Sequence, residues 1–148
     1  MELQKINDFF NCSKFAVVGV SSDTKKMGNA IFRELKKQLY DVVPINPNTN
    51  EIEGVPCCHS IAELPSAIEA LIFTTKQEIT HALVKEAIDK GIKQMFFQQG
   101  SAKQETIEFA KKNGINTIYN RCVFMFTNPK GMHKFHTILS KLFRTYPN

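Results

Sequence analysis

The sequence predicts an α/β protein with a Rossmann-like, doubly wound sheet of five mainly parallel strands and helices on both faces. Short apolar segments alternate with amphipathic segments along the chain. This alternation, at intervals of roughly 20–25 residues, is typical of right-handed βαβ crossovers. Residues 15–20 and 70–73 are continuously apolar, as expected for strands that are covered on both faces.

Five apolar segments that end in loop residues are the predicted strands: 15–20, 41–45, 70–74, 94–97 and 115–119. Pro44 has no N–H group to donate, so the second strand is expected to end or to bulge there. A turn-forming cluster at 46–50 and a short extended piece at 51–57 follow this strand.

Segments with apolar residues three and four positions apart are the predicted helices. They are a short opening helix with Leu3, Ile6, Phe9 and Phe10, a helix over about 28–39 with Ile31, Phe32, Leu35 and Leu39, a helix with Ile79, Leu83, Val84, Ala87 and Ile88, and a final helix with Met132, Phe135, Ile138, Leu139, Leu142 and Phe143.

Two capping boxes predict the starts of two further helices. The boxes are Ser60-Ile-Ala-Glu63 and Ser101-Ala-Lys-Gln104. The first opens a brief helix that stops before Pro65, and the second opens a helix that ends at Gly114. Gly91 marks the end of the helix before the fourth strand.

The length of 148 residues suits a single domain. We expect residues 1–126 to form it and residues 127–148 to form a basic amphipathic helix. This terminal segment has no acidic residue and four basic ones: Lys130, Lys134, Lys141 and Arg144. Its apolar stripe must be buried, either against the same domain or in an oligomer contact such as a homodimer.

Composition and charge argue against several classes of protein. The N-terminus has no signal-peptide layout and no apolar run approaches the ~20 residues of a membrane span, which predicts a cytoplasmic protein without membrane contact. Basic and aromatic residues do not interleave, so nucleic acid is not an expected partner. The four cysteines have no C-x-x-C spacing, which favours reduced thiols and no metal site.

The loop between the first strand and the next helix, residues 19–29, is the strongest functional signal. It is rich in small residues, with Lys25 and Lys26 between Gly19 and Gly28. A strand, a small-residue loop and a helix N-terminus present backbone N–H groups to phosphate in open α/β sheets. The loop has neither the G-x-G-x-x-G of a dinucleotide site nor the pattern of a P-loop. It therefore indicates a phosphate-rich ligand held differently from NAD.

Polar or small residues follow every predicted strand. The five sets are 19–26, 46–48, 74–77, 98–101 and 120–122. In a parallel doubly wound sheet these sets meet at one edge, and ligands bind beyond the carboxyl ends of the strands. We therefore expect a ligand pocket at that edge.

Five short motifs occur in a recognisable order along the chain. They are Gly19-Val-Ser21-Ser22, Val43-Pro-Ile-Asn46-Pro47, Gly54-Val-Pro-Cys57, Phe97-Gln98-Gln99-Gly100 and Asn120-Arg121-Cys122. With these motifs the sequence resembles the small CoA-binding proteins, which are similar to the N-terminal CoA-binding domain of the succinyl-CoA synthetase α subunit. Each motif is weak by itself, but their order and spacing are specific. The resemblance covers about residues 12 to 124.

The resemblance implies that CoA, or an acyl-CoA, lies over the strand ends as a small-molecule ligand. Gly19, Ser21 and Ser22 would meet the phosphates, and Lys25 and Lys26 would lie nearby. The chain departs from the family here, because many relatives carry an arginine in this loop.

The other contacts implied by the resemblance concern the two ends of the ligand. They are Asn46 and Pro47 at the adenosine end, and Thr74, Thr75, Gln98 and Gly100 along the pantetheine arm.

These observations favour a binding protein without chemistry of its own, since none of the four histidines has an evident carboxylate orienter. Two alternatives stay open. One is an NAD(P)-binding protein, which the sequence disfavours because the third glycine and an acidic residue after the second strand are missing. The other is an acyl or thiol transferase that uses Cys122, whose neighbour Arg121 would make the thiol more reactive.

Overall fold

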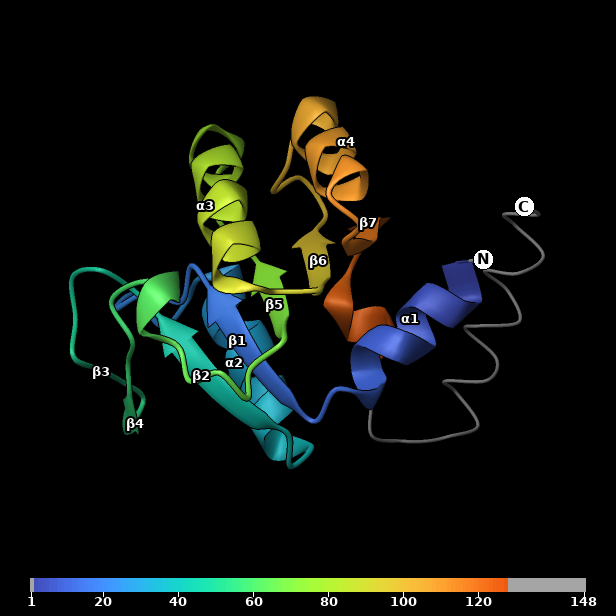
Figure 1. Ribbon diagram of the computed structural model, residues 1–148. Coiled ribbons are helices and arrows are strands. Elements are labelled where there is room, and N and C mark those ends of the chain that lie inside the picture. The colour runs from blue at the N-terminus through green and yellow to red at the C-terminus, as the bar shows by residue number, and fades with distance from the viewer. Residues whose placement is uncertain (1, 128–148) are drawn as a thin grey trace.

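The computed structural model describes residues 2–127 of the protein (Figure 1). Its helices and short 3₁₀ turns are α1 (Glu2–Asn11), α2 (Met27–Lys37), η1 (Ile61–Glu63), α3 (Gln77–Lys90), α4 (Gln104–Lys112) and η2 (Val123–Met125). Its strands are β1 (Lys14–Val18), β2 (Asp41–Ile45), β3 (Glu51–Ile52), β4 (Val55–Pro56), β5 (Ala70–Phe73), β6 (Gln94–Gln98) and β7 (Asn116–Arg121). The predicted terminal helix lies outside the described residues.

Five strands form one parallel sheet in the order β2-β1-β5-β6-β7, which confirms the predicted doubly wound α/β fold. The order is that of the flavodoxin-like sheets, in which the winding direction reverses beside the first strand. Here the reversal lies between β1 and β5, so the loops that follow these two strands leave the sheet side by side.

Helices cover both faces of the sheet. The buried apolar residues of α1 and α2 pack on one face of the sheet, and those of α3 and α4 pack on the other. The helices α3 and α4 stand together in Figure 1. The first face is rich in phenylalanine: the rings of Phe9 and Phe15 are 5.2 Å apart and those of Phe9 and Phe96 are 5.6 Å apart. On the second face Phe73 stacks on Phe97 at 5.2 Å. Close aromatic pairs of this kind add to the stability that burial provides.

Two apolar residues assigned to buried helix stripes are exposed. The helix predicted over 28–39 ends at Lys37, and Leu39 is 93% exposed with a φ of 67°. This residue makes the turn into β2, so the apolar spacing continues past the end of the helix. Ile79 lies in the first turn of α3 and is 51% exposed.

Neither predicted capping box forms. Ser60 precedes η1 without a side-chain cap, and the Glu63 carboxylate accepts the His59 N–H instead, at 2.7 Å. Ser101 is buried, and its N–H donates to the Gln98 carbonyl in a tight turn. The helix α4 therefore begins three residues after the predicted cap, with Lys103 at the N-cap position.

Pro44 does not interrupt β2, which pairs with β1 in continuous register as far as Ile45. The expected bulge is wrong because β2 is the outer strand of the sheet. The Pro44 carbonyl faces away from β1 and accepts the Cys58 N–H at 3.0 Å. The missing N–H would face the same way, so no hydrogen bond to β1 is lost.

Stability is expected to fall at alkaline pH. Burial raises the pKa of the Cys57 and Cys58 thiols and of the Tyr40 hydroxyl above their ordinary values. The folded protein keeps these protons where the unfolded chain has already lost some, so the free energy of unfolding should fall between about pH 8.5 and 10.5. Urea denaturation across this range measures the effect. A double variant, C57S/C58S, should show a shallower fall, and an equal slope in both proteins would contradict the assignment.

Candidate functional site

The loops after β1 and β5 meet at the point where the winding of the sheet reverses. The N–H and Oγ1 of Thr74 both donate to the Val18 carbonyl, at 2.9 and 2.8 Å. A Cβ atom on Gly19 would lie 2.6 Å from Thr74 Oγ1, and Gly19 has a φ of 106°. Gly19 and Thr74, both predicted site residues, are thus in contact.

The first turn of α2 packs directly on this contact. A Cβ atom on Gly28 would lie 2.7 Å from both the Gly19 carbonyl oxygen and Thr74 Oγ1. Backbone atoms of the loop cannot retreat as the end of a flexible side chain would. A glycine here therefore allows the N-terminus of α2 to approach the ends of β1 and β5.

Asn29 of α2, which the sequence analysis missed, binds the loop backbone from its buried side. Its side chain is fully buried, accepts the Ser21 N–H at 2.8 Å and donates to the Ser21 carbonyl at 2.7 Å. The signal that could have found Asn29 is an amide side chain in a helix, two and three positions before the apolar residues Ile31 and Phe32. A buried amide needs hydrogen-bond partners, and here the loop backbone supplies them.

The outer part of the loop is built from two small side-chain turns. Ser21 Oγ accepts the Asp23 N–H at 3.0 Å, and Asp23 Oδ1 accepts the Lys25 N–H at 3.1 Å. Ser22, Lys25 and Lys26 are exposed, so their side chains are accessible to a ligand. Asp23 places one carboxylate among them, which the sequence analysis did not consider.

Several N–H groups of the loop and of the first turn of α2 have no acceptor among the described residues. They belong to Ser22, Thr24, Met27 and Gly28. The N-cap residue of α2, Lys26, provides no side-chain cap. A helix N-terminus with unpaired N–H groups favours an anion.

Lysine also occupies the N-cap positions of α3 and α4, as Lys76 and Lys103, again without a side-chain cap. Ser, Thr, Asp or Asn is the usual choice, and a cation opposes the helix dipole at this end. Since all three helices follow strands of one parallel sheet, the three lysines lie at one edge. Glu78 and Glu105 in the first turns of α3 and α4 offset part of this charge, whereas the first turn of α2 has no acidic residue, so the start of α2 suits an anionic ligand best.

Asn46 has an internal role in the structure. Its Nδ2 donates to the Val20 carbonyl at 2.7 Å, and its Oδ1 accepts the Asn48 N–H at 2.7 Å. These bonds tie the end of β2 to the start of the 19–26 loop. Pro47, the other residue assigned to the adenosine end, is exposed beside it.

The residues assigned to the pantetheine arm divide into two groups. Thr75 lies in the loop after β5, where its Oγ1 is 2.7 Å from Thr80 Oγ1. Gly100 is exposed at a turn with a φ of 85°. Gln98 is buried, accepts the Val123 N–H at 3.0 Å and donates to Cys122 Sγ at 3.1 Å. Both the oxygen and the nitrogen of the Gln98 amide therefore bind the segment after β7.

One histidine does have a carboxylate neighbour, contrary to the sequence analysis. His59 Nδ1 lies 3.7 Å from Glu63, and its Nε2 lies 2.7 Å from Asn50 Oδ1. The His59 and Glu63 side chains are both about half exposed, and the contacts join the turn after β2 to η1. Within residues 2–127 no group of three or more potential metal ligands comes together, and no helix is long and apolar enough to cross a bilayer.

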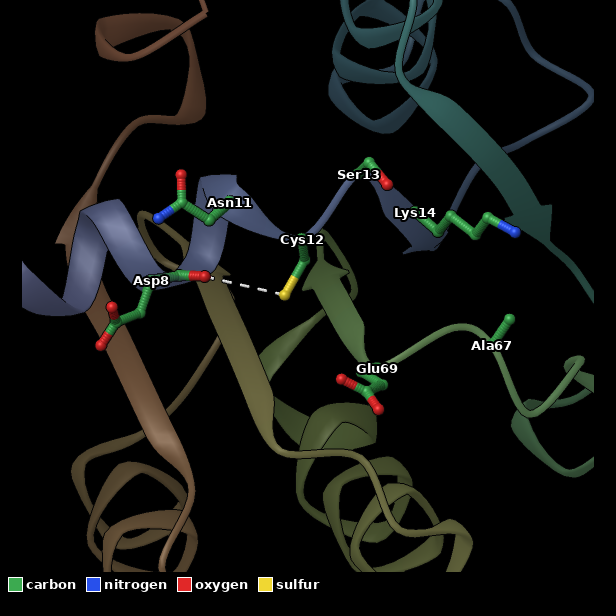
Figure 2. Close-up of a pocket in the computed structure, with 7 residues that line it drawn as sticks. All are labelled: Asp8, Asn11, Cys12, Ser13, Lys14, Ala67 and Glu69. Carbon is green, nitrogen blue, oxygen red and sulfur yellow. Dashed lines mark hydrogen bonds between the residues drawn. The ribbon is translucent and has the colours of Figure 1, made fainter.

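A pocket of about 440 Å³ lies at the opposite edge of the sheet, near the amino ends of β1 and β5 (Figure 2). Its lining residues are Asp8, Asn11, Cys12, Ser13, Lys14, Ala67 and Glu69. Burial, followed by the nearby Glu69 and Asp8 carboxylates, raises the pKa of the Cys12 thiol. Two carboxylates and one ammonium group do not suit a polyphosphate, so this pocket does not match the predicted ligand.

The fold defines a doubly wound α/β protein, a class in which ligands bind beyond the carboxyl ends of the strands. The chain belongs to the CoA-binding domain family, whose model matches residues 13–128. This confirms the resemblance seen in the sequence. The link to succinyl-CoA synthetase holds only loosely, at the level of a shared CoA-binding domain.

Two curated relatives illustrate the family. One is "Acetate--CoA ligase [ADP-forming] II subunit alpha" of Pyrococcus furiosus, 30% identical over 126 residues; the match covers 78% of this chain and 28% of that protein. The chain thus spans less than a third of that relative. The other is "Uncharacterized protein YneT" of Bacillus subtilis, 23% identical, with 74% of this chain and 82% of that protein covered.

Solved structures agree with the fold. A conserved hypothetical protein from Pyrococcus furiosus is 35% identical with a TM-score of 0.72, and the match covers 74% of this chain and 95% of that one. A hypothetical protein from Pyrococcus horikoshii is 26% identical with a TM-score of 0.76, covering 94% of this chain and 92% of that one.

Gly28→Ala should destabilise the protein by roughly 1–3 kcal/mol, because the added methyl group overpacks the contact with Gly19 and Thr74. At an ordinary helix position the same change would stabilise by about 1 kcal/mol. Urea denaturation gives the sign directly. A more stable variant would show that α2 can move away from the loop without cost.

Asn29→Ala should cost about 1–3 kcal/mol and loosen the loop, since the Ser21 N–H and carbonyl lose buried partners. Chemical denaturation and amide exchange at Ser21 measure the two effects. Asn48→Ala is the matched control, because it removes the same group from an exposed side chain at the same edge. Equal effects from the two substitutions would refute the special role of Asn29.

Proposed function

We propose that the protein binds coenzyme A, or an acyl-CoA, at the carboxyl ends of the strands and performs no chemistry of its own. The observation that carries this proposal is the loop at 19–26 with the first turn of α2. It combines unpaired N–H groups, a helix N-terminus and two exposed lysines. Membership of the CoA-binding domain family supports CoA as the ligand.

Charge at this edge supports a ligand with several phosphates. The loops after the strands, residues 19–26, 46–50, 74–76 and 98–103, contain four lysines and one acidic residue, Asp23, and Glu78 and Glu105 follow in the first turns of α3 and α4. The positive charge is therefore least offset at the start of α2, whose first turn has no acidic residue. CoA carries a pyrophosphate and a separate 3′-phosphate. Each phosphate can accept charge-assisted hydrogen bonds, which contribute about 1.5–3 kcal/mol each.

Apolar side chains lie next to the charged groups. Met27 and Ile79, in the first turns of α2 and α3, are 50% and 51% exposed. Exposed apolar groups beside an anion site suit a ligand that joins phosphates to an apolar part. The adenine ring and the pantetheine or acyl arm of CoA provide that part.

Within this proposal, the predicted site residues take direct and indirect roles. The residues proposed to contact the ligand are Gly19, Ser21, Ser22, Lys25, Lys26, Pro47, Thr74, Thr75 and Gly100. Asn46 and Gln98 act through other residues, because their amides are bonded within the protein. Asn46 would shape the start of the loop, and Gln98 would shape the segment that contains Cys122.

The two alternatives make different demands on the site. NAD(P) binding usually places an acidic residue after the second strand for the ribose, and the amide of Asn46 stands there, bonded to Val20. A transferase would need an accessible base near Cys122. Incubation with acetyl-CoA, followed by assays for free CoA and for acylated Cys122, separates a binder from a transferase.

Isothermal titration calorimetry with CoA, dephospho-CoA, NAD and NADP tests the proposal. CoA should bind, and the double variant K25A/K26A should bind it at least roughly ten-fold more weakly, the loss expected for one charge-assisted contact. A larger loss for CoA than for dephospho-CoA would assign a lysine to the 3′-phosphate. The control is K36A/K37A, which removes the same charge from the other end of α2.

Three results would refute parts of this proposal. Binding of NAD but not of CoA would overturn the ligand assignment. Equal losses from the two double variants would reduce the role of Lys25 and Lys26 to general charge. Release of free CoA from acetyl-CoA by the protein, abolished in Cys122→Ser, would overturn the absence of chemistry.

A further inference from the structure

The tip of the β3–β4 hairpin reaches the loop at 19–26 through one acidic residue. Glu53 and Gly54 form the hairpin turn, with φ values of 49° and 81°. A two-residue turn with both φ values positive favours Asn-Gly or Asp-Gly, and glutamate is an unusual choice in the first position. Its backbone conformation is disfavoured for a residue with a long side chain, so contacts of the side chain must compensate.

Both oxygens of the Glu53 carboxylate face donors from α2. Oε1 lies 2.9 Å from Arg33 Nη1, and Oε2 lies 3.5 Å from Asn29 Nδ2. Asn29 and Arg33 are four residues apart and therefore share one face of the helix. The Glu53 side chain is 23% exposed and the Arg33 side chain is 47% exposed, so only the carboxylate is partly shielded from solvent.

The same two donors hold the loop at two points. Asn29 pairs with the N–H and carbonyl of Ser21, and Arg33 Nη1 donates to the Thr24 carbonyl at 3.1 Å. Ser22, whose N–H has no acceptor among the described residues, lies between these points. Within residues 2–127, the hydrogen bonds and the ion pair of the Glu53 carboxylate thus reach the loop through Asn29 and Arg33.

We propose that Glu53 is a positioning residue, which fixes the loop at 21–26 in its ligand-binding conformation before the ligand arrives. An exposed loop that must be ordered by its ligand loses affinity through the entropy of ordering. The clamp formed by Glu53, Asn29 and Arg33 lowers that loss. The choice of CoA as the ligand rests on the function proposed above, whereas the order of the loop does not.

Amide hydrogen exchange of the ligand-free protein, together with calorimetry on CoA, tests the clamp. In Glu53→Gln, the hydrogen-bonded amides of the loop, those of Ser21, Asp23, Lys25 and Lys26, should exchange roughly two- to five-fold faster, the range for loss of a surface ion pair, while β1 amides are unchanged. CoA should bind more weakly by a similar factor. Glu51→Gln is the matched control, because it removes a carboxylate from the same hairpin at an exposed position.

Two further variants check that the effect comes from the carboxylate and its ion pair rather than from poor folding of Glu53→Gln. Glu53→Gly removes the carboxylate without straining the turn and should loosen the loop as Glu53→Gln does, even if the latter folds poorly. The double variant R33Q/E53Q should loosen the loop by less than the sum of the two single variants, because Arg33 and Glu53 share one ion pair.

The outcomes separate the clamp from the proposed ligand. Unchanged loop exchange in both Glu53 variants would overturn the clamp. Tighter CoA binding with unchanged exchange would also overturn it, since Glu53 would then act only by repelling the ligand. Failure of the wild-type protein to bind CoA would overturn the proposed function, while the exchange data would still decide on the clamp.

Discussion

The architecture of the candidate site depends on one steric constraint, the approach of the first turn of α2 to the loops after β1 and β5. The helix packs so closely that a Cβ atom on Gly28 would collide with the Gly19 carbonyl oxygen and with Thr74. This contact sets how deeply the helix N-terminus enters the edge of the sheet. The buried amide of Asn29 then follows in the chain and is placed to hold Ser21. Steric fit and hydrogen bonding thus act in sequence on the same turn of helix.

Around this junction, three separate segments contribute to one small region. Asn46, after β2, donates to the Val20 carbonyl, and Glu53 of the β3–β4 hairpin pairs with Arg33 of α2. Thr80 of α3 bonds both to Thr75, in the loop after β5, and to the Ser101 carbonyl. Each link is a hydrogen bond or an ion pair between segments far apart in the sequence. The loop is therefore shaped by its surroundings more than by its own composition, which supplies only short turns.

The sequence could predict what is encoded locally. The alternation of apolar and amphipathic segments predicted the sheet and its helices correctly. The phosphate site that the glycines of the first loop indicate stays a prediction. Asn29 and Glu53 could not be found in this way, because their partners lie 8 to 24 residues away and only folding brings them together. The same limit explains the errors at Leu39 and Ser101. Helical spacing does not show where a helix stops, and a capping pattern does not show whether its serine is buried.

The common direction of three helices has a kinetic consequence. The helices α2, α3 and α4 all begin at the edge where the strands end, so the partial positive charges of three helix N-termini lie at that edge, beside Lys26, Lys76 and Lys103. The last turns of the same helices place charge of the same sign at the other edge, on Lys36, Lys37, Lys90, Lys111 and Lys112. The attraction of an anion to the open loops is therefore short-ranged, and the rate of encounter, and not only the affinity, depends on ionic strength.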